Sequence, residues 1–126
     1  MKQCVVTDKA PAAVGPYSQA VWAGDFLYCS GQIPLDPATG DLVGATAREQ
    51  AIQVLENVEE VLVSQGLSMG HVVKATVFAT DMKYFPEVNE VYAAKFTVDP
   101  PARSFVQVAG LPKGALVEIE VVAWRG

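Results

Sequence analysis

The chain has 126 residues, of which 51% are hydrophobic and 18% charged, and this composition is typical of one globular domain with its own hydrophobic core. Its 9 basic and 14 acidic side chains give a net charge of −5 without any lysine and arginine cluster, which disfavours nucleic acid or an anionic membrane as a partner. The sequence shows no secretory signal pattern and no apolar run of ~18 residues, so we expect a cytoplasmic protein. Two cysteines without C-x-x-C spacing and a single histidine predict no metal site.

The first third of the chain predicts three strands. Residues 4–6 form a short β-prone run, and the segment 10–16 that follows contains two prolines and a glycine, which exclude a regular element. Further strands are expected over 17–22 and 26–30. The short turn between these two predicts direct antiparallel pairing.

Two helices are predicted from apolar residues at three-and-four spacing. The first covers 46–65, with Thr46 as N-cap, a capping box to Glu49 and Gly66 as the C-terminal stop. The second begins at Pro86, which suits a first helical turn, and runs to about residue 96.

Three more strands are predicted in the second half. Residues 71–80 are apolar on much of both faces, which favours a central strand, and 103–108 and 117–121 alternate between polar and apolar residues. The connection 109–115 is long for a tight hairpin and leaves room for a third strand between the last two. The chain 1–126 is thus expected to form one α+β domain, with two helices packed against one mixed sheet.

The alternation in the last two strands also predicts which side chains share a face. If one apolar layer covers both strands, the buried face carries Ser104, Val106, Val108, Val117, Ile119 and Val121. The opposite face then carries Arg103, Gln107, Glu118 and Glu120. This polar face is either a solvated surface or a site in which a guanidinium holds a carboxylate while a nearby carboxylate handles a water molecule.

Two other places are candidates for ligand contacts. Ser30 and Gly31 are expected at a strand end, where backbone N–H groups leave the ladder and can face a ligand, although an ordinary strand exit explains them too. Asn89 is a poor helix former near the start of the second helix, so its side chain has a role either in a site or in capping.

Several multi-residue motifs occur in a fixed order along nearly the whole chain. They are Ala-Pro-Ala-Ala-Val-Gly-Pro-Tyr-Ser-Gln-Ala at 10–20, Ser-Gly-Gln-Ile-Pro at 30–34, Val-Asn-Glu-Val-Tyr at 88–92, Pro-Ala-Arg-Ser at 101–104, Leu-Pro-Lys-Gly at 111–114 and Val-Glu-Ile-Glu at 117–120. Together they resemble the reactive intermediate deaminase family, RidA, also called YjgF.

The resemblance implies a chorismate-mutase-like α+β fold in which two helices cover one face of a mixed sheet and the strand 72–80 lies between the last two strands. It implies a homotrimer with three equivalent sites in clefts between subunits. It also implies hydrolysis of reactive enamines and imines, such as 2-aminoacrylate, 2-iminopropanoate and 2-iminobutanoate, to 2-keto acids and ammonia. Members of the family need neither a metal nor an organic cofactor.

The resemblance carries specific roles onto residues of this chain. Arg103 matches the arginine that binds the substrate carboxylate, and Glu118 matches the glutamate that positions the attacking water. The positions that line the same cleft are Tyr17, Ser30, Gly31 and Asn89. One position departs from the pattern, because Phe105 stands where many bacterial members have a cysteine, so a thiol there cannot be required for activity of this protein.

Two other functions remain open at this point. A non-enzymatic trimer that binds small carboxylates or regulates a partner would use the same clefts, since one fold hosts many functions. Ribonuclease or translation-inhibitor activity, described for some relatives, is disfavoured by the net charge of −5.

Overall fold

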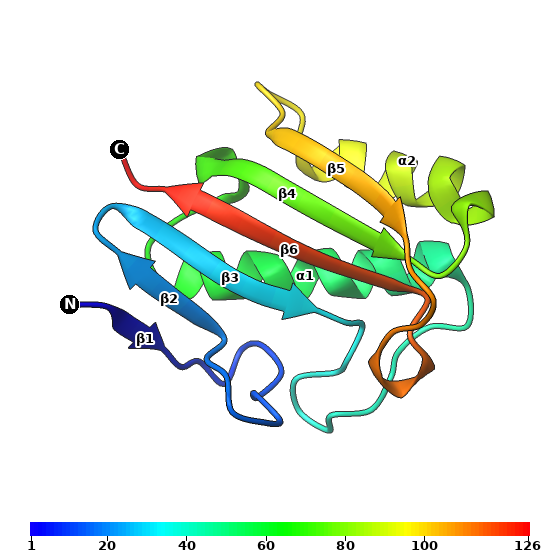
Figure 1. Ribbon diagram of the computed structural model, residues 1–126, viewed down its shortest axis with the longest axis horizontal. Coiled ribbons are helices and arrows are strands. Elements are labelled where there is room, and N and C mark those ends of the chain that lie inside the picture. Colours follow the sequence, from blue (N-terminus) through cyan, green and yellow to red (C-terminus); the bar gives the residue numbers. More distant parts are fainter.

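A six-stranded mixed sheet with both α-helices on one of its faces makes up the molecule, seen here in a computed structural model that describes residues 1–126 (Figure 1). The strands are β1 Gln3–Val5, β2 Ala20–Ala23, β3 Phe26–Gln32, β4 Val72–Ala79, β5 Ala102–Gln107 and β6 Val117–Trp124. Their order in the sheet is β1-β2-β3-β6-β4-β5, and every neighbouring pair is antiparallel except the parallel pair β4 and β5. The predicted α+β architecture is confirmed.

The strand order agrees with the expectation drawn from the long final connection. β4 lies between β5 and β6, and the predicted β2–β3 hairpin is present. β2 begins three residues later than predicted, and β3 continues two residues further, to Gln32.

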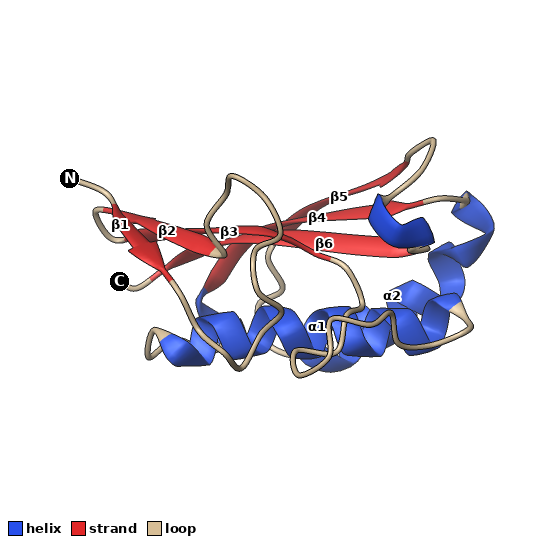
Figure 2. Cartoon of the chain, turned by 90° about the horizontal axis from the view of Figure 1, so that it is seen from below, coloured by secondary structure: helices blue, strands red, loops and turns tan.

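Helix α1, Ala47–Ser64, packs along the sheet beneath β3 and β6 (Figure 2). Thr46 caps it, with the reciprocal bonds of the capping box to Glu49, and Gly66 follows its end at a φ of 75°. Helix α2, Phe85–Lys95, has Pro86 in its first turn and packs against α1. Neither helix combines the length and the apolar character that a bilayer-spanning segment needs.

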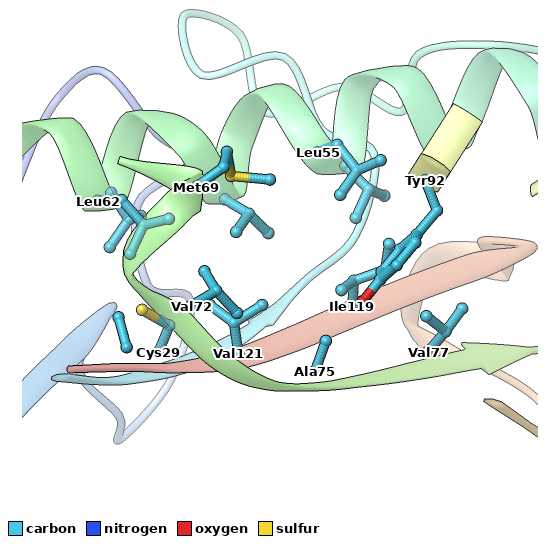
Figure 3. Close-up of a cluster of buried hydrophobic side chains, with 14 of the residues drawn as sticks. Cys29, Leu55, Leu62, Met69, Val72, Ala75, Val77, Tyr92, Ile119 and Val121 are labelled. Carbon is cyan, nitrogen blue, oxygen red and sulfur yellow. The ribbon is translucent and has the colours of Figure 1, made fainter. Parts of the chain in front are cut away.

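The hydrophobic core fills the layer between the sheet and the two helices (Figure 3). Leu55 and Leu62 of α1 meet the sheet residues Val77, Ile119 and Val121, all of which are almost fully buried. Burial of these apolar side chains determines which face of each strand turns toward the helices.

The other face of the sheet is left uncovered by the α-helices (Figure 2). Phe26 and Trp124 are register partners on this face, and both are exposed, as is Tyr28. Exposed aromatic side chains gathered on one sheet face are typical of a surface that another protein covers.

The prediction of shared faces in the last two strands is wrong for β5. Arg103 is the register partner of Ala75, which is buried against the helices, so Arg103 and Phe105 lie on the helix side. Ser104 and Val106 lie on the open side instead. The physical reason is that β5 is an edge strand beside α2, where polar and aromatic side chains of the helix accommodate the arginine.

Candidate functional site

A cavity of about 480 Å³ is formed at the end of β3, where several loops meet strand β6. Its wall includes Tyr17, Ser30, Gly31, Lys113, Glu118 and Glu120. Glu118 and Glu120 alternate with the buried Val117 and Ile119 along β6, so both carboxylates project from the open face of the sheet. Four of the six predicted site residues therefore meet in this cavity.

A β-bulge shapes the floor of the cavity. The register of β3 against β6 shifts between Cys29 and Gln32, so that Ser30 and Gly31 together oppose Glu120. The predicted strand end at these residues is therefore wrong, since β3 continues through them. Their backbone groups still depart from the regular ladder, as a bulge requires.

Gly31 leaves open the space that the Glu118 side chain occupies. A Cβ atom at position 31 would lie 2.4 Å from Glu118 Oε2 and 2.8 Å from its Cδ, distances that real contacts do not reach. Any other residue would displace the carboxylate. A glycine is required here because the Glu118 carboxylate lies directly against the Gly31 backbone.

The hydroxyl groups of Ser30 and Tyr17 have different capacities for a ligand. Ser30 Oγ donates to the Ser18 carbonyl oxygen at 2.6 Å, so its proton is engaged and its two oxygen lone pairs can accept. The Tyr17 hydroxyl oxygen accepts from the Val14 N–H at 3.3 Å, which leaves its own proton free to donate.

Gln19 is a buried polar residue that lies in the motif at 10–20 and was not predicted to have a role of its own. Its Oε1 accepts from Thr7 N–H at 2.7 Å, while its Nε2 donates to the carbonyl oxygens of Thr7 at 3.0 Å and Pro11 at 2.8 Å. Gln19 thus holds the loop whose residues Pro11 and Ala12 form one wall of the cavity. A glutamine in a stretch predicted as strand was the only signal of this role.

The electrostatic state of Glu118 differs from that of an ordinary surface glutamate. Burial raises the pKa of the Glu118 carboxyl, and the negative charge of Glu120 raises that pKa further. No hydrogen bond or ion pair holds its oxygens. A half-buried carboxylate with free oxygens and a raised pKa is suited to accept a proton from water.

Arg103 is held at the edge of the sheet by neutral groups. Its Nη1 donates to Asn89 Oδ1 at 2.8 Å, and its Cζ lies 4.7 Å from the ring centre of Tyr92, with the rings of Phe105 and Phe85 next nearest. Asn89 therefore supports the arginine and does not cap α2. No carboxylate lies within 4.0 Å of the guanidinium, so its charge remains available to an anion.

One chain alone does not bring Arg103 and Glu118 together. Phe78 is the β4 partner of Glu118, whereas the neighbouring Val77 is the partner of the helix-side residue Phe105. Because successive residues of a strand point to opposite faces, Glu118 lies on the open face and Arg103 on the helix side. The prediction that they share a face is wrong, and the six site residues form two groups.

Comparison with known proteins identifies the class to which this fold and these two groups of residues belong. A family model described as Endoribonuclease L-PSP matches residues 7–125. A RutC family protein of Pyrococcus horikoshii is 47% identical over 125 residues, which cover 99% of each chain. The 2-iminobutanoate/2-iminopropanoate deaminase of Mus musculus is 47% identical over 126 residues, covering 100% of this chain and 93% of the mouse protein.

Solved structures agree with this placement. A protein of the conserved Rid family from Yersinia pestis superimposes with a TM-score of 0.96 at 48% identity, covering 98% of this chain and 99% of that one. The TdcF protein of E. coli, solved with bound serine, gives a TM-score of 0.94 at 45% identity, with coverages of 98% and 99%. The chain belongs to the RidA/YjgF family.

Proposed function

We propose that the protein is a cofactor-independent deaminase that hydrolyses 2-imino acids and their enamine tautomers to 2-keto acids and ammonia. Its substrates would include 2-aminoacrylate, 2-iminopropanoate and 2-iminobutanoate. The observation that carries the proposal is a guanidinium with no acidic partner in a chain that also holds a free, half-buried carboxylate. The name of the mouse relative and the serine bound to TdcF, an amino acid with a carboxylate, support the same substrate class.

The residues divide the hydrolysis into separate tasks. Arg103 binds the substrate carboxylate through two parallel N–H donors, which fixes the imine carbon in one position. Glu118 accepts a proton from a water molecule as the water oxygen attacks that carbon and the C=N π electrons move to nitrogen. The nitrogen takes up one proton to give the carbinolamine and a second proton from the protonated Glu118. The C–N bond then breaks to release ammonia, and the hydroxyl loses its proton to leave the keto group.

Cavity residues assist at the nitrogen. The free proton of the Tyr17 hydroxyl is available to the imine nitrogen, and the Ser30 hydroxyl oxygen can accept from an N–H of the carbinolamine. An enamine substrate must first gain a proton at its terminal carbon, because water attacks only the imine tautomer.

The site would be completed between copies of the chain in a homotrimer. Within one copy Arg103 and Glu118 lie on opposite faces of the sheet, and the open face exposes Phe26, Tyr28 and Trp124. A neighbouring copy packed on this face would bury these aromatic side chains and bring its Arg103 edge toward the Glu118 cavity.

The direct test is competition between hydrolysis and chemical trapping. An amino acid oxidase generates the imine in situ, and semicarbazide traps whatever is not hydrolysed. We expect the native protein to suppress trapping and Arg103→Ala to lose about 10²-fold or more in kcat/KM, since a charge-assisted bidentate contact is removed.

Arg125→Ala is the matched control for this test. Arg125 also lies over an aromatic ring, that of Trp22 at 4.6 Å, but outside the site, so its removal should leave turnover unchanged. Equal turnover by Arg103→Ala and the native protein would refute the assignment of Arg103. A native protein that binds 2-keto acids without accelerating hydrolysis would favour the non-enzymatic alternative.

RNA cleavage is a second candidate because the matching family model carries an endoribonuclease description. The net charge of −5 opposes binding of a polyanion, which depends on cationic contacts to phosphates. Cleavage of RNA by highly purified protein, lost in Glu118→Gln, would establish this activity.

A further inference from the structure

Three aromatic rings surround the Arg103 guanidinium. Its Cζ lies 4.7 Å from the ring centre of Tyr92, 5.6 Å from that of Phe105 and 5.8 Å from that of Phe85. All three distances are within the ~6 Å over which a cation is attracted to an aromatic face. We call Phe85, Tyr92 and Phe105 the aromatic box.

The rings of the aromatic box are themselves held in place. Phe85 and Phe105 contact each other with ring centres 4.8 Å apart at 60°, and Tyr92 packs on Phe96 at 4.5 Å. These tilted arrangements are favourable for aromatic pairs. The box is therefore a rigid enclosure that spans α2 and β5.

The guanidinium needs such an enclosure because few polar groups fix it. Its one hydrogen bond within the chain goes to Asn89, and no carboxylate neutralises it. One hydrogen bond leaves an arginine side chain free to rotate, whereas a planar ion in contact with three rings has few orientations open to it. An acidic partner would also hold the arginine, but it would compete with the substrate anion.

We propose that the aromatic box is a positioning device that aims the Arg103 fork at its anionic ligand. The proposal rests on the proposed role of Arg103 in binding the substrate carboxylate. The rings touch the arginine and act through it, so they are positioning residues. They should govern affinity for the carboxylate and leave the chemical step to Glu118.

Substitutions of Tyr92 can test the role of its aromatic ring apart from that of its hydroxyl group. Tyr92 is only 5% exposed, and its buried hydroxyl has no hydrogen-bond partner. An unpartnered buried hydroxyl costs stability, so the box requires the ring alone. Tyr92→Phe should therefore retain the native affinity for the carboxylate, while Tyr92→Leu should lower that affinity.

The experiment measures affinity and turnover separately. Calorimetry with 2-oxobutanoate gives the Kd of a 2-keto acid, and the trapping assay gives KM and kcat for 2-iminobutanoate. Phe105→Leu and Tyr92→Leu are expected to raise Kd and KM by about 2- to 30-fold, the range of cation–π energies, with kcat within about twofold of native. Phe105→Tyr and Tyr92→Phe keep a ring and should stay near the native values.

The controls distinguish the box from the function on which it rests. Arg125→Ala removes a cation–π contact elsewhere and should not change Kd, and thermal unfolding with light scattering shows that each variant keeps its fold and assembly. If Arg103→Ala loses 2-oxobutanoate but Phe105→Leu and Tyr92→Leu bind it like the native protein, the box is refuted and the proposed function stands. If Arg103→Ala itself binds normally, the carboxylate assignment fails and the box with it.

Discussion

The ionised form of Glu118 lowers the stability of the folded chain. Burial and the neighbouring Glu120 raise the pKa of the Glu118 carboxyl above its ordinary value of 4.5. The folded state therefore binds the proton more tightly than the unfolded state does. The stability linked to this proton is fully present below about pH 4.5 and is lost as the pH rises through the folded-state pKa.

Glu118→Gln should accordingly stabilise the protein at neutral pH while removing its activity. The glutamine has no charge to bury, so the gain over the native protein should grow from pH 4.5 towards pH 7. Turnover should fall by about 10²- to 10⁴-fold, the usual loss when a general base is removed. Urea unfolding across this pH range measures the first effect, and a native protein that is the more stable of the two at pH 7 would contradict it.

Gly31→Ala tests the contact between the bulge and the carboxylate. The new Cβ would overlap the end of the Glu118 side chain, which can rotate away. We therefore expect a folded protein with about 10- to 100-fold lower kcat, since a shift of about 1 Å in a catalytic group has this effect. Gly70→Ala is the control, because its Cβ would make only an ordinary 3.5 Å contact. Native turnover in Gly31→Ala would show that the position of Glu118 is not critical.

Among the elements, those with strong local signals could be predicted from the sequence. The period of α1, its capping box at Thr46 and the glycine after its end all depend on residues a few positions apart. The β2–β3 hairpin follows in the same way from its short turn.

Structural features that depend on contacts with another strand or helix could not be predicted from the sequence. Both faces of β5 carry mixed side chains, so alternation alone did not decide whether Arg103 or Ser104 faces α2. The bulge at Ser30 and Gly31 depends on the register against β6, about 90 residues away along the chain, and nothing in the local sequence specifies it. Both errors concern the candidate site, where side chains are placed for ligands and the hydrophobic pattern is weakest.

The loop held by Gln19 provides a test at the level of an element. Gln19→Met keeps the size of the side chain but removes the hydrogen-bond partner of the part-buried Thr7 backbone and of the buried Ala10 and Pro11 carbonyls. We expect a loss of about 2–4 kcal/mol in the free energy of unfolding, measured by urea titration. Gln3→Met, at an exposed position of β1, serves as the control, and equal losses in both variants would contradict the role of Gln19.

At the scale of the whole molecule, the candidate site is divided between two surfaces of the chain. The cavity residues Tyr17, Gly31 and Glu118 lie on the open face, and the pair Arg103 and Asn89 lies at the edge beside α2. The same open face exposes aromatic side chains. The proposed assembly would account for both features, since a second copy would cover this face and supply the guanidinium.

Complementation between two inactive variants tests this claim most directly. Arg103→Ala and Glu118→Gln are unfolded together, refolded as an equal mixture and assayed for hydrolysis of 2-iminobutanoate. If each site takes its arginine from one copy and its glutamate from another, random mixing restores about a quarter of the native activity, because about one interface in four pairs two intact residues. If the mixture stays as inactive as either variant alone while forming mixed oligomers, the site does not lie between copies and the account is contradicted.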